Sequence, residues 1–145
     1  MKSTEQPVTG AAFALDPQLA HDTLVIGDLP LSRVLLMNDA NFPWLIIVPR
    51  RAGTAEVFDL TPADQMRLMA EIARVGELLK EVTGCDKINT AAIGNIVPQL
   101  HVHIIARSRS DAAWPRPAWG ALPACPYDEA ARECLLAVLR KKIPG

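Results

Sequence analysis

The distribution of apolar residues predicts three short strands in the first third of the chain. Runs at 23–26, 33–37 and 44–48 are rich in Val, Ile and Leu, and Gly, Pro, Asp and Asn lie between them. Apolar runs of this length, bounded by turn-forming residues, are typical of β-strands. We therefore expect three consecutive antiparallel strands.

The next segment has the periodicity of an amphipathic helix. Thr61 is a suitable N-cap, Pro62 suits the first helical position, and Gly84 can end the helix in a left-handed conformation. The apolar positions at helical spacing are Met66, Leu68, Met69, Ile72, Val75, Leu78 and Leu79. We expect one long helix from Thr61 to Gly84 that packs on a sheet.

The rest of the chain predicts two more strands and a second helix. Residues 87–93 and 100–107 have the composition of strands joined by a tight connection at 94–98, and residues 128–141 have that of a helix. The proline-rich segment WPRPAWGALPACP should lack regular structure. Because strands and helices do not alternate, the pattern predicts an α+β fold: an antiparallel five-stranded sheet with one long helix packed on it and a C-terminal helix.

Length and charge narrow the class of protein. The 145 residues suit a single domain over 1–145, and a hydrophobic content of 50% is enough for a core without metals or disulfides. Lys and Arg number 15 against 16 Asp and Glu, which gives a net charge of −1. Such a chain has no overall field for nucleic acid or an anionic membrane, and we expect neither as a partner.

The cysteines and the N-terminus favour a cytoplasmic location. The chain has three cysteines, an odd number, at positions 85, 125 and 134, and they lack CxxC spacing. They therefore predict neither a disulfide framework nor a four-thiolate metal site. The first residues, MKSTEQPVTGAAFALD, lack the apolar core of a signal peptide. No apolar run approaches the length of a transmembrane helix, about 18 residues.

The peptide PQLHVHIIAR, residues 98–107, carries the clearest chemistry. Side chains alternate along a strand, so Gln99, His101 and His103 should share one face and the intervening apolar residues the other. Residues two apart in a strand are separated by about 7 Å. One substrate group could therefore contact both histidines.

Three interpretations of this face stay open on the residues alone. The histidines suit ordinary sheet positions with hydrogen-bond partners. Imidazoles two residues apart can also chelate a metal ion, but no nearby His, Asp or Glu supplies the third ligand in the sequence. The third interpretation is nucleophilic catalysis at phosphorus, in which a neutral imidazole attacks while polar neighbours stabilise the charged oxygens.

The surrounding sequence resembles the histidine triad (HIT) family, whose mark is three histidines alternating with apolar residues on one strand. QLHVHII fills that frame with Gln99, His101 and His103, so glutamine stands at the first position. The resemblance extends over about residues 34–119 and includes WLIIVPRR, the long helix, and GNIVPQLHVHIIAR followed by DAAWPRPAWG. It implies a HIT-like fold and a homodimer whose sheets join across the two-fold axis.

The resemblance also implies an activity. Such a protein binds a nucleoside phosphate conjugate and, as a phosphoramidase or dinucleoside polyphosphate hydrolase, cleaves at the α-phosphorus through a nucleotidyl-histidine, with no metal or other cofactor. His101 matches the nucleophile, and a backbone carbonyl or another acceptor should hold its second ring nitrogen. His103 then binds the phosphate or helps to protonate the leaving group. Because Gln99 cannot carry a proton as imidazole does, the alternative is a nucleotide-binding module or scaffold with weak or lost catalysis.

Substrate contacts follow from the same resemblance. Asn38 matches a position that contacts the ribose, and Asn89 one that supports the phosphate site. Asn95 and Ile96 stand where members with all three histidines have a Gln and a Ser or Thr on the phosphate. We expect backbone N–H groups of the 94–97 turn to replace the missing hydroxyl.

The aromatic residues and the remaining polar residues have two interpretations each. Trp114 or Trp119 could match a tail tryptophan that closes the active site from the partner subunit, or both rings could cover a helix or the dimer interface. Trp44 is expected in the core or against the outer wall of a base pocket. Arg107 could clamp a phosphate or be solvated, and His21 is assigned no function.

Overall fold

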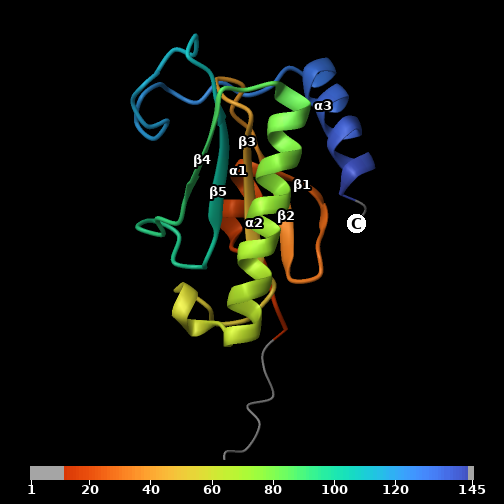
Figure 1. The fold of residues 1–145 in the computed structure, drawn as a ribbon, viewed down its shortest axis with the longest axis vertical. Coiled ribbons are helices and arrows are strands. Elements are labelled where there is room, and N and C mark those ends of the chain that lie inside the picture. The colour runs from red at the N-terminus through yellow and green to blue at the C-terminus, as the bar shows by residue number, and fades with distance from the viewer. Residues whose placement is uncertain (1–11, 144–145) are drawn as a thin grey trace, which may run out of the picture.

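The computed structural model describes residues 12–143 (Figure 1). Residues 1–11 and 144–145 lie outside the described residues. They include most of the N-terminal stretch expected not to be a signal peptide, and both ends of the expected domain. Within 12–143, no helix combines the length and the apolarity needed to cross a bilayer.

Five strands form one antiparallel sheet in the order β1-β2-β3-β5-β4. They are β1 (Thr23–Asp28), β2 (Ser32–Met37), β3 (Trp44–Pro49), β4 (Lys87–Ala91) and β5 (Val102–Arg107). The expected strands and their antiparallel pairing are confirmed. The last two are shorter than expected, because Gly94 adopts a φ of 67° and the N–H of Leu100 bonds to Thr54 O at 2.9 Å instead of to a strand.

The two expected helices lie on the same face of the sheet (Figure 1). For α2 (Pro62–Thr83), Thr61 Oγ1 accepts a hydrogen bond from the N–H of Asp64 at 3.2 Å, and Gly84 ends the helix at a φ of 64°. For α3 (Glu129–Lys142), the Asp128 side chain accepts from the N–H of Ala131 at 2.8 Å. The capping residues therefore set these boundaries as the sequence indicates.

A third helix, α1 (Pro17–Asp22), was not expected and lies on the opposite face of the sheet. Asp16 caps it through a 2.8 Å bond from the N–H of Gln18 to its side chain. Asp-Pro is a recognisable start signal, but a helix of 6 residues is too short to show a periodic pattern. The 3₁₀ helix η1 (Val57–Asp59) follows β3, and residues 114–126 form turns and irregular structure as expected.

The sheet separates two apolar clusters, and β5 contributes to both. Val102 and Ile104 pack on the side of α2 and α3, whereas Ile105 packs on the side of α1 with Ile46 and Phe42. The alternation expected for this strand is therefore confirmed. It places His103, an odd-numbered residue like Ile105, on the face that α1 partly covers.

Candidate active site

His101 and His103 lie side by side on the α1 face of the sheet. His103 is in β5 and His101 immediately precedes it, and each residue is 6% exposed. Their ring centroids are 4.9 Å apart. This distance is shorter than the backbone spacing of about 7 Å for residues two apart in a strand, so the rings lean toward each other. One small group can contact both rings.

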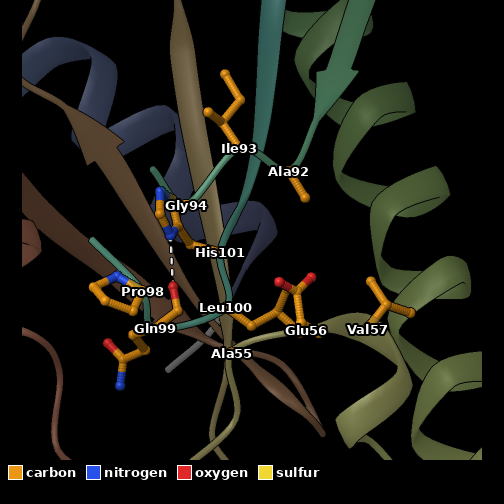
Figure 2. A pocket seen from close by; sticks show the side chains of 10 residues that line it. All are labelled: Ala55, Glu56, Val57, Ala92, Ile93, Gly94, Pro98, Gln99, Leu100 and His101. Carbon is orange, nitrogen blue, oxygen red and sulfur yellow. Dashed lines mark hydrogen bonds between the residues drawn. The ribbon is translucent and has the colours of Figure 1, made fainter. Parts of the chain in front are cut away.

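The main chain sets the tautomer of His101. Its Nδ1 lies 2.7 Å from the carbonyl oxygen of Gln99 (Figure 2). A carbonyl oxygen only accepts, so Nδ1 carries a proton, and in the neutral imidazole Nε2 keeps its lone pair. This confirms the expectation that a backbone carbonyl holds the second ring nitrogen. A neutral imidazole in this state is a nucleophile.

Trp44 sets the opposite tautomer in His103. The indole Nε1–H of Trp44 donates to Nδ1 of His103 at 3.0 Å. An indole nitrogen only donates, so His103 carries its proton on Nε2. Burial, and then the neighbouring His101, lower the pKa of His103 from 6.5 to about 4. At neutral pH His103 is therefore an uncharged donor.

Trp119 completes an aromatic cluster around His103. Its ring centroid lies 5.2 Å from that of His103 and 5.6 Å from that of Trp44, both edge to face. The expectation for Trp44 did not include its bond to His103, although a buried indole N–H requires an acceptor. Trp119 reaches His103 within its own chain, from the irregular segment after β5.

Two adjoining pockets open on this face. The histidine pocket has a volume of about 410 Å³ and is lined by His101, His103, Trp119, residues 93–97, and side chains of α1, β2 and β3. The outer pocket, of about 450 Å³, shares Asp22, Met37 and Trp119 with it. The two pockets are therefore adjacent, and together we call them the groove. Among residues 12–143, no Lys or Arg lines either pocket.

A smaller pocket of about 110 Å³ lies beside the same loop (Figure 2). In that view the Glu56 carboxylate and the His101 ring lie on opposite sides of the chain between Pro98 and His101. Leu100, which also lines it, belongs to the core on the α2 side. Ile93, Gly94 and His101 line both this pocket and the histidine pocket, whereas His103 lines only the histidine pocket.

Three of the expected substrate-binding residues line the groove. Asn95 and Ile96 line the histidine pocket, and the side chain of Ile96 is 89% exposed. Asn38 lines the outer pocket, where its Oδ1 accepts a 3.0 Å bond from the N–H of Tyr127. His21, to which we assigned no function, lines the outer pocket as well.

Asn89 and Trp114 are not brought to the groove. Both instead surround Arg107, which is 1% exposed rather than solvated and which forms a 2.8 Å ion pair with Asp111. Asn89 Oδ1 accepts from Nη1 of Arg107 at 3.2 Å, and the Trp114 ring lies 5.9 Å from the guanidinium carbon. A buried guanidinium needs partners for its donors, and this need explains the placement of these residues.

Gln99 also departs from the expected position. Its side chain does not line the histidine pocket but bonds to the main chain of Ala14 and Asp16. Only its backbone carbonyl reaches the site, at Nδ1 of His101. Among residues 12–143, no group of three or more His, Cys, Asp or Glu is arranged to hold a metal ion.

Comparisons with known proteins agree with this geometry. The HIT domain family matches residues 18–110. A histidine triad protein from Bradyrhizobium japonicum is 53% identical, with a TM-score of 0.89 over 92% of this chain and 99% of that one. A HIT protein from Sinorhizobium meliloti is 47% identical, with a TM-score of 0.87 over 90% and 97%. One from Marinobacter aquaeolei is 43% identical, with a TM-score of 0.88 over 92% and 99%.

A search of curated proteins gave no match. The family is therefore established by the domain match and by solved structures with nearly the same length and fold. The two imidazoles lie in that fold beside the histidine pocket, His103 in β5 and His101 immediately before it. The chain belongs to the histidine triad (HIT) family.

Proposed function

We propose that this protein is a hydrolase or nucleotidyl transferase that acts at the α-phosphorus of nucleoside phosphate conjugates. Nucleotide hydrolysis or transfer is typical of the family. The observation that carries the proposal is the 2.7 Å bond between His101 Nδ1 and the Gln99 carbonyl. In the neutral imidazole, this bond leaves the lone pair on Nε2, beside pockets of about 410 and 450 Å³.

The proposed reaction has two displacements. Nε2 of His101 forms a bond to the α-phosphorus as the bond from phosphorus to the leaving group breaks. The leaving group departs with the bonding electrons and takes a proton from water. A second water then adds to phosphorus, loses a proton to solvent and displaces Nε2, which releases the nucleoside monophosphate. Another acceptor in place of this water makes the protein a transferase.

His103 serves as a hydrogen-bond donor in this scheme. Its Nε2–H bonds to a non-bridging phosphate oxygen, whose charge grows as His101 attacks. Protonation of the leaving group by an imidazolium is disfavoured, because the pKa of His103 is lowered to about 4. Of the two roles expected for His103, phosphate binding is therefore the better supported.

The groove offers sites for both halves of a nucleotide. The turn at 93–97 lines the histidine pocket and contains Gly94 at positive φ. In the proposed complex, its backbone N–H groups bind the phosphate. Leu19, Met37 and Ile46 supply apolar walls for the nucleoside. Asn38, whose carbonyl oxygen is bound by Tyr127, is left to contact the ribose through its amide nitrogen.

We also propose that the protein is a homodimer. The edge strand β4 pairs with β5 on one side, and Lys87 and Thr90 on it are exposed. An exposed edge presents backbone donors and acceptors for another strand. Sedimentation at micromolar concentration should therefore give the mass of two chains, and the mass of one chain would contradict this proposal.

Release of AMP from adenosine 5′-phosphoramidate tests the activity. The full-length protein should release AMP with or without chelator, and His101→Ala should lower kcat at least about a thousandfold, since it removes the nucleophile. Gln65→Ala, on α2 away from both pockets, is the control. Unchanged turnover in His101→Ala would refute the mechanism. Binding of AMP without turnover of this substrate would favour the nucleotide-binding module.

A further inference from the structure

We propose that Gln99 is a positioning residue, which fastens residues 13–16 and thereby α1 as one wall of the histidine pocket. The proposal rests on the proposed function, because it names how the nucleotide pocket is completed. It assigns the Gln99 side chain to affinity rather than to the chemistry at phosphorus.

The Gln99 carboxamide makes two hydrogen bonds to one short stretch of main chain. Its Oε1 accepts from the N–H of Asp16 at 2.8 Å, and its Nε2 donates to the carbonyl of Ala14 at 2.8 Å. These groups flank Leu15, so the amide pairs with the segment as a neighbouring strand would. We call this pair of bonds the amide clamp.

Few side chains can form the amide clamp. A carboxylate has only acceptors and keeps at most the bond from Asp16. An imidazole has one donor and one acceptor, but they lie on different sides of the ring and cannot meet both groups of a flat main-chain edge. Glutamine supplies a donor and an acceptor from one planar end. The residue type at position 99 therefore matches this contact.

The clamped segment leads directly into the pocket wall. Asp16 accepts from the N–H of Gln18 and so caps α1, and Gln18 Nε2 donates to Asp22 Oδ2 at 2.8 Å. Gln18, Leu19 and Asp22 all line the histidine pocket, and Leu19 is 4% exposed. The carbonyl of Asp22 accepts from the N–H of Asn38 at 3.0 Å. The wall is thus fastened at its end by Asn38 and at its beginning by Gln99.

The wall needs these attachments because α1 is short. A helix of 6 residues is not stable by itself in water, so its position depends on tertiary contacts. Phe13 and Leu15 add partial packing against the core on the α1 face. Loss of the amide clamp should therefore loosen α1 while the sheet, and the bond from His101 to the Gln99 main chain, stay in place.

A split between KM and kcat tests the proposal. For adenosine 5′-phosphoramidate, Gln99→Ala should raise KM about tenfold and change kcat less than about twofold, since two neutral hydrogen bonds are lost away from phosphorus. Amide exchange at Asp16 in the free protein should accelerate about tenfold. Gln99→Glu should raise KM and accelerate exchange at Asp16 by less than Gln99→Ala does, because a carboxylate can keep the bond from Asp16. The matched control Gln65→Ala loses a side-chain bond to Leu60 O and should change neither quantity.

A second pair of variants checks that the effect passes through the segment. Leu15→Ala loosens the same residues from the other side, so its effect on KM should be less than additive with that of Gln99→Ala. A cooperative thermal unfolding transition in each variant will serve as the check that the sheet is intact. Additive effects on KM would mean that the two residues act separately, and would count against the proposal.

Other outcomes overturn it directly. If Gln99→His raises kcat and leaves KM unchanged, position 99 acts on the chemistry. If Gln99→Ala accelerates exchange at Asp16 but leaves KM unchanged, the wall does not contribute to binding. If the unaltered protein neither binds nor turns over nucleotides, the proposed function fails, while the exchange measurement still decides whether Gln99 holds the segment.

Discussion

The indole N–H of Trp44 and the imidazole of His103 form a 3.0 Å hydrogen bond between two adjacent strands of the sheet. The side chains are 59 positions apart, and both residues are 6% exposed. Because indole has no lone pair to offer, the bond excludes a proton from Nδ1 of His103. It holds His103 neutral and leaves Nε2–H as the ring's one donor, on a residue that lines the histidine pocket.

Replacing Trp44 by Phe should therefore weaken the hydrogen bond that His103 donates to the phosphate, without moving the His103 side chain far. We expect kcat/KM for adenosine 5′-phosphoramidate to fall about tenfold, because the Nε2–H tautomer is no longer enforced and part of the phosphate contact is lost. The ¹⁵N shifts of the His103 ring should change from the pattern of one tautomer to that of a mixture. In Trp114→Phe, which alters the ring beside Arg107, those shifts should stay as they are. An unaltered His103 spectrum in Trp44→Phe would show that the indole does not set the tautomer.

The low pKa of His103 predicts a loss of stability in mild acid. The folded protein holds the pKa at about 4 against an ordinary 6.5, so between these values the unfolded chain binds more protons. The contribution of His103 to the free energy of unfolding should be complete above about pH 6.5. It should fall by about 3 kcal/mol as the pH drops toward 4. Urea unfolding at several pH values measures the slope.

His103→Asn is the matched variant for that measurement. It should be less stable at neutral pH but show a shallower fall between about pH 6.5 and pH 4. An equal slope in both proteins would mean that other groups cause the acid sensitivity.

The buried pair of Arg107 and Asp111 should matter for folding more than for catalysis. Arg107 is 1% exposed, and its hydrogen bonds hold the pKa of Asp111 well below the usual range. Asp111→Asn leaves a buried guanidinium without its counter-charge and should lower the free energy of unfolding by about 3 kcal/mol. Chemical denaturation measures this loss.

A surface ion pair provides the control for Asp111→Asn. Arg132 and Glu133 are 3.3 Å apart on α3 with 30% and 60% of their side chains exposed. Glu133→Gln should change stability by less than about 0.5 kcal/mol. If the two substitutions cost the same, burial of the Arg107 pair is not what stabilises the fold.

The charge of the groove predicts a preference among substrates. Because no Lys or Arg in residues 12–143 lines either pocket, a conjugate with one negative charge should be a better substrate than a polyphosphate. We expect kcat/KM for adenosine 5′-phosphoramidate to exceed that for diadenosine tetraphosphate by about tenfold or more.

Position 96 allows this preference to be shifted. Ile96 is 89% exposed at the rim of the histidine pocket, so Ile96→Lys adds a cation there without disturbing the core. It should lower KM for diadenosine tetraphosphate, and the gain should shrink in high salt. The neutral Ile96→Gln serves as the control. If the two variants behave alike, charge does not set the preference.

The sequence by itself determined the five strands, the two longer helices and the strand face that carries the histidines. Thr61 and Gly84 mark the ends of the long helix, and the alternation of histidines with apolar residues predicts that His101 and His103 lie on the face opposite Val102 and Ile104. These features depend on local rules, namely capping, helical spacing and the alternation of a strand, and they are visible without the fold. The match of QLHVHII to a HIT strand belongs to the same kind of information.

Only the tertiary structure decided which side chains meet at the site. Trp44 and Trp119 reach His103, whereas Asn89 and Trp114 turn to Arg107 and the Gln99 side chain turns to the main chain of residues 14–16. The hydrogen bonds of Trp44, Asn89 and Gln99 join polar groups that are 59, 18 and 85 positions apart in the sequence. The energy of such a contact depends on which groups the packed sheet and loops bring together, and no local pattern carries that information.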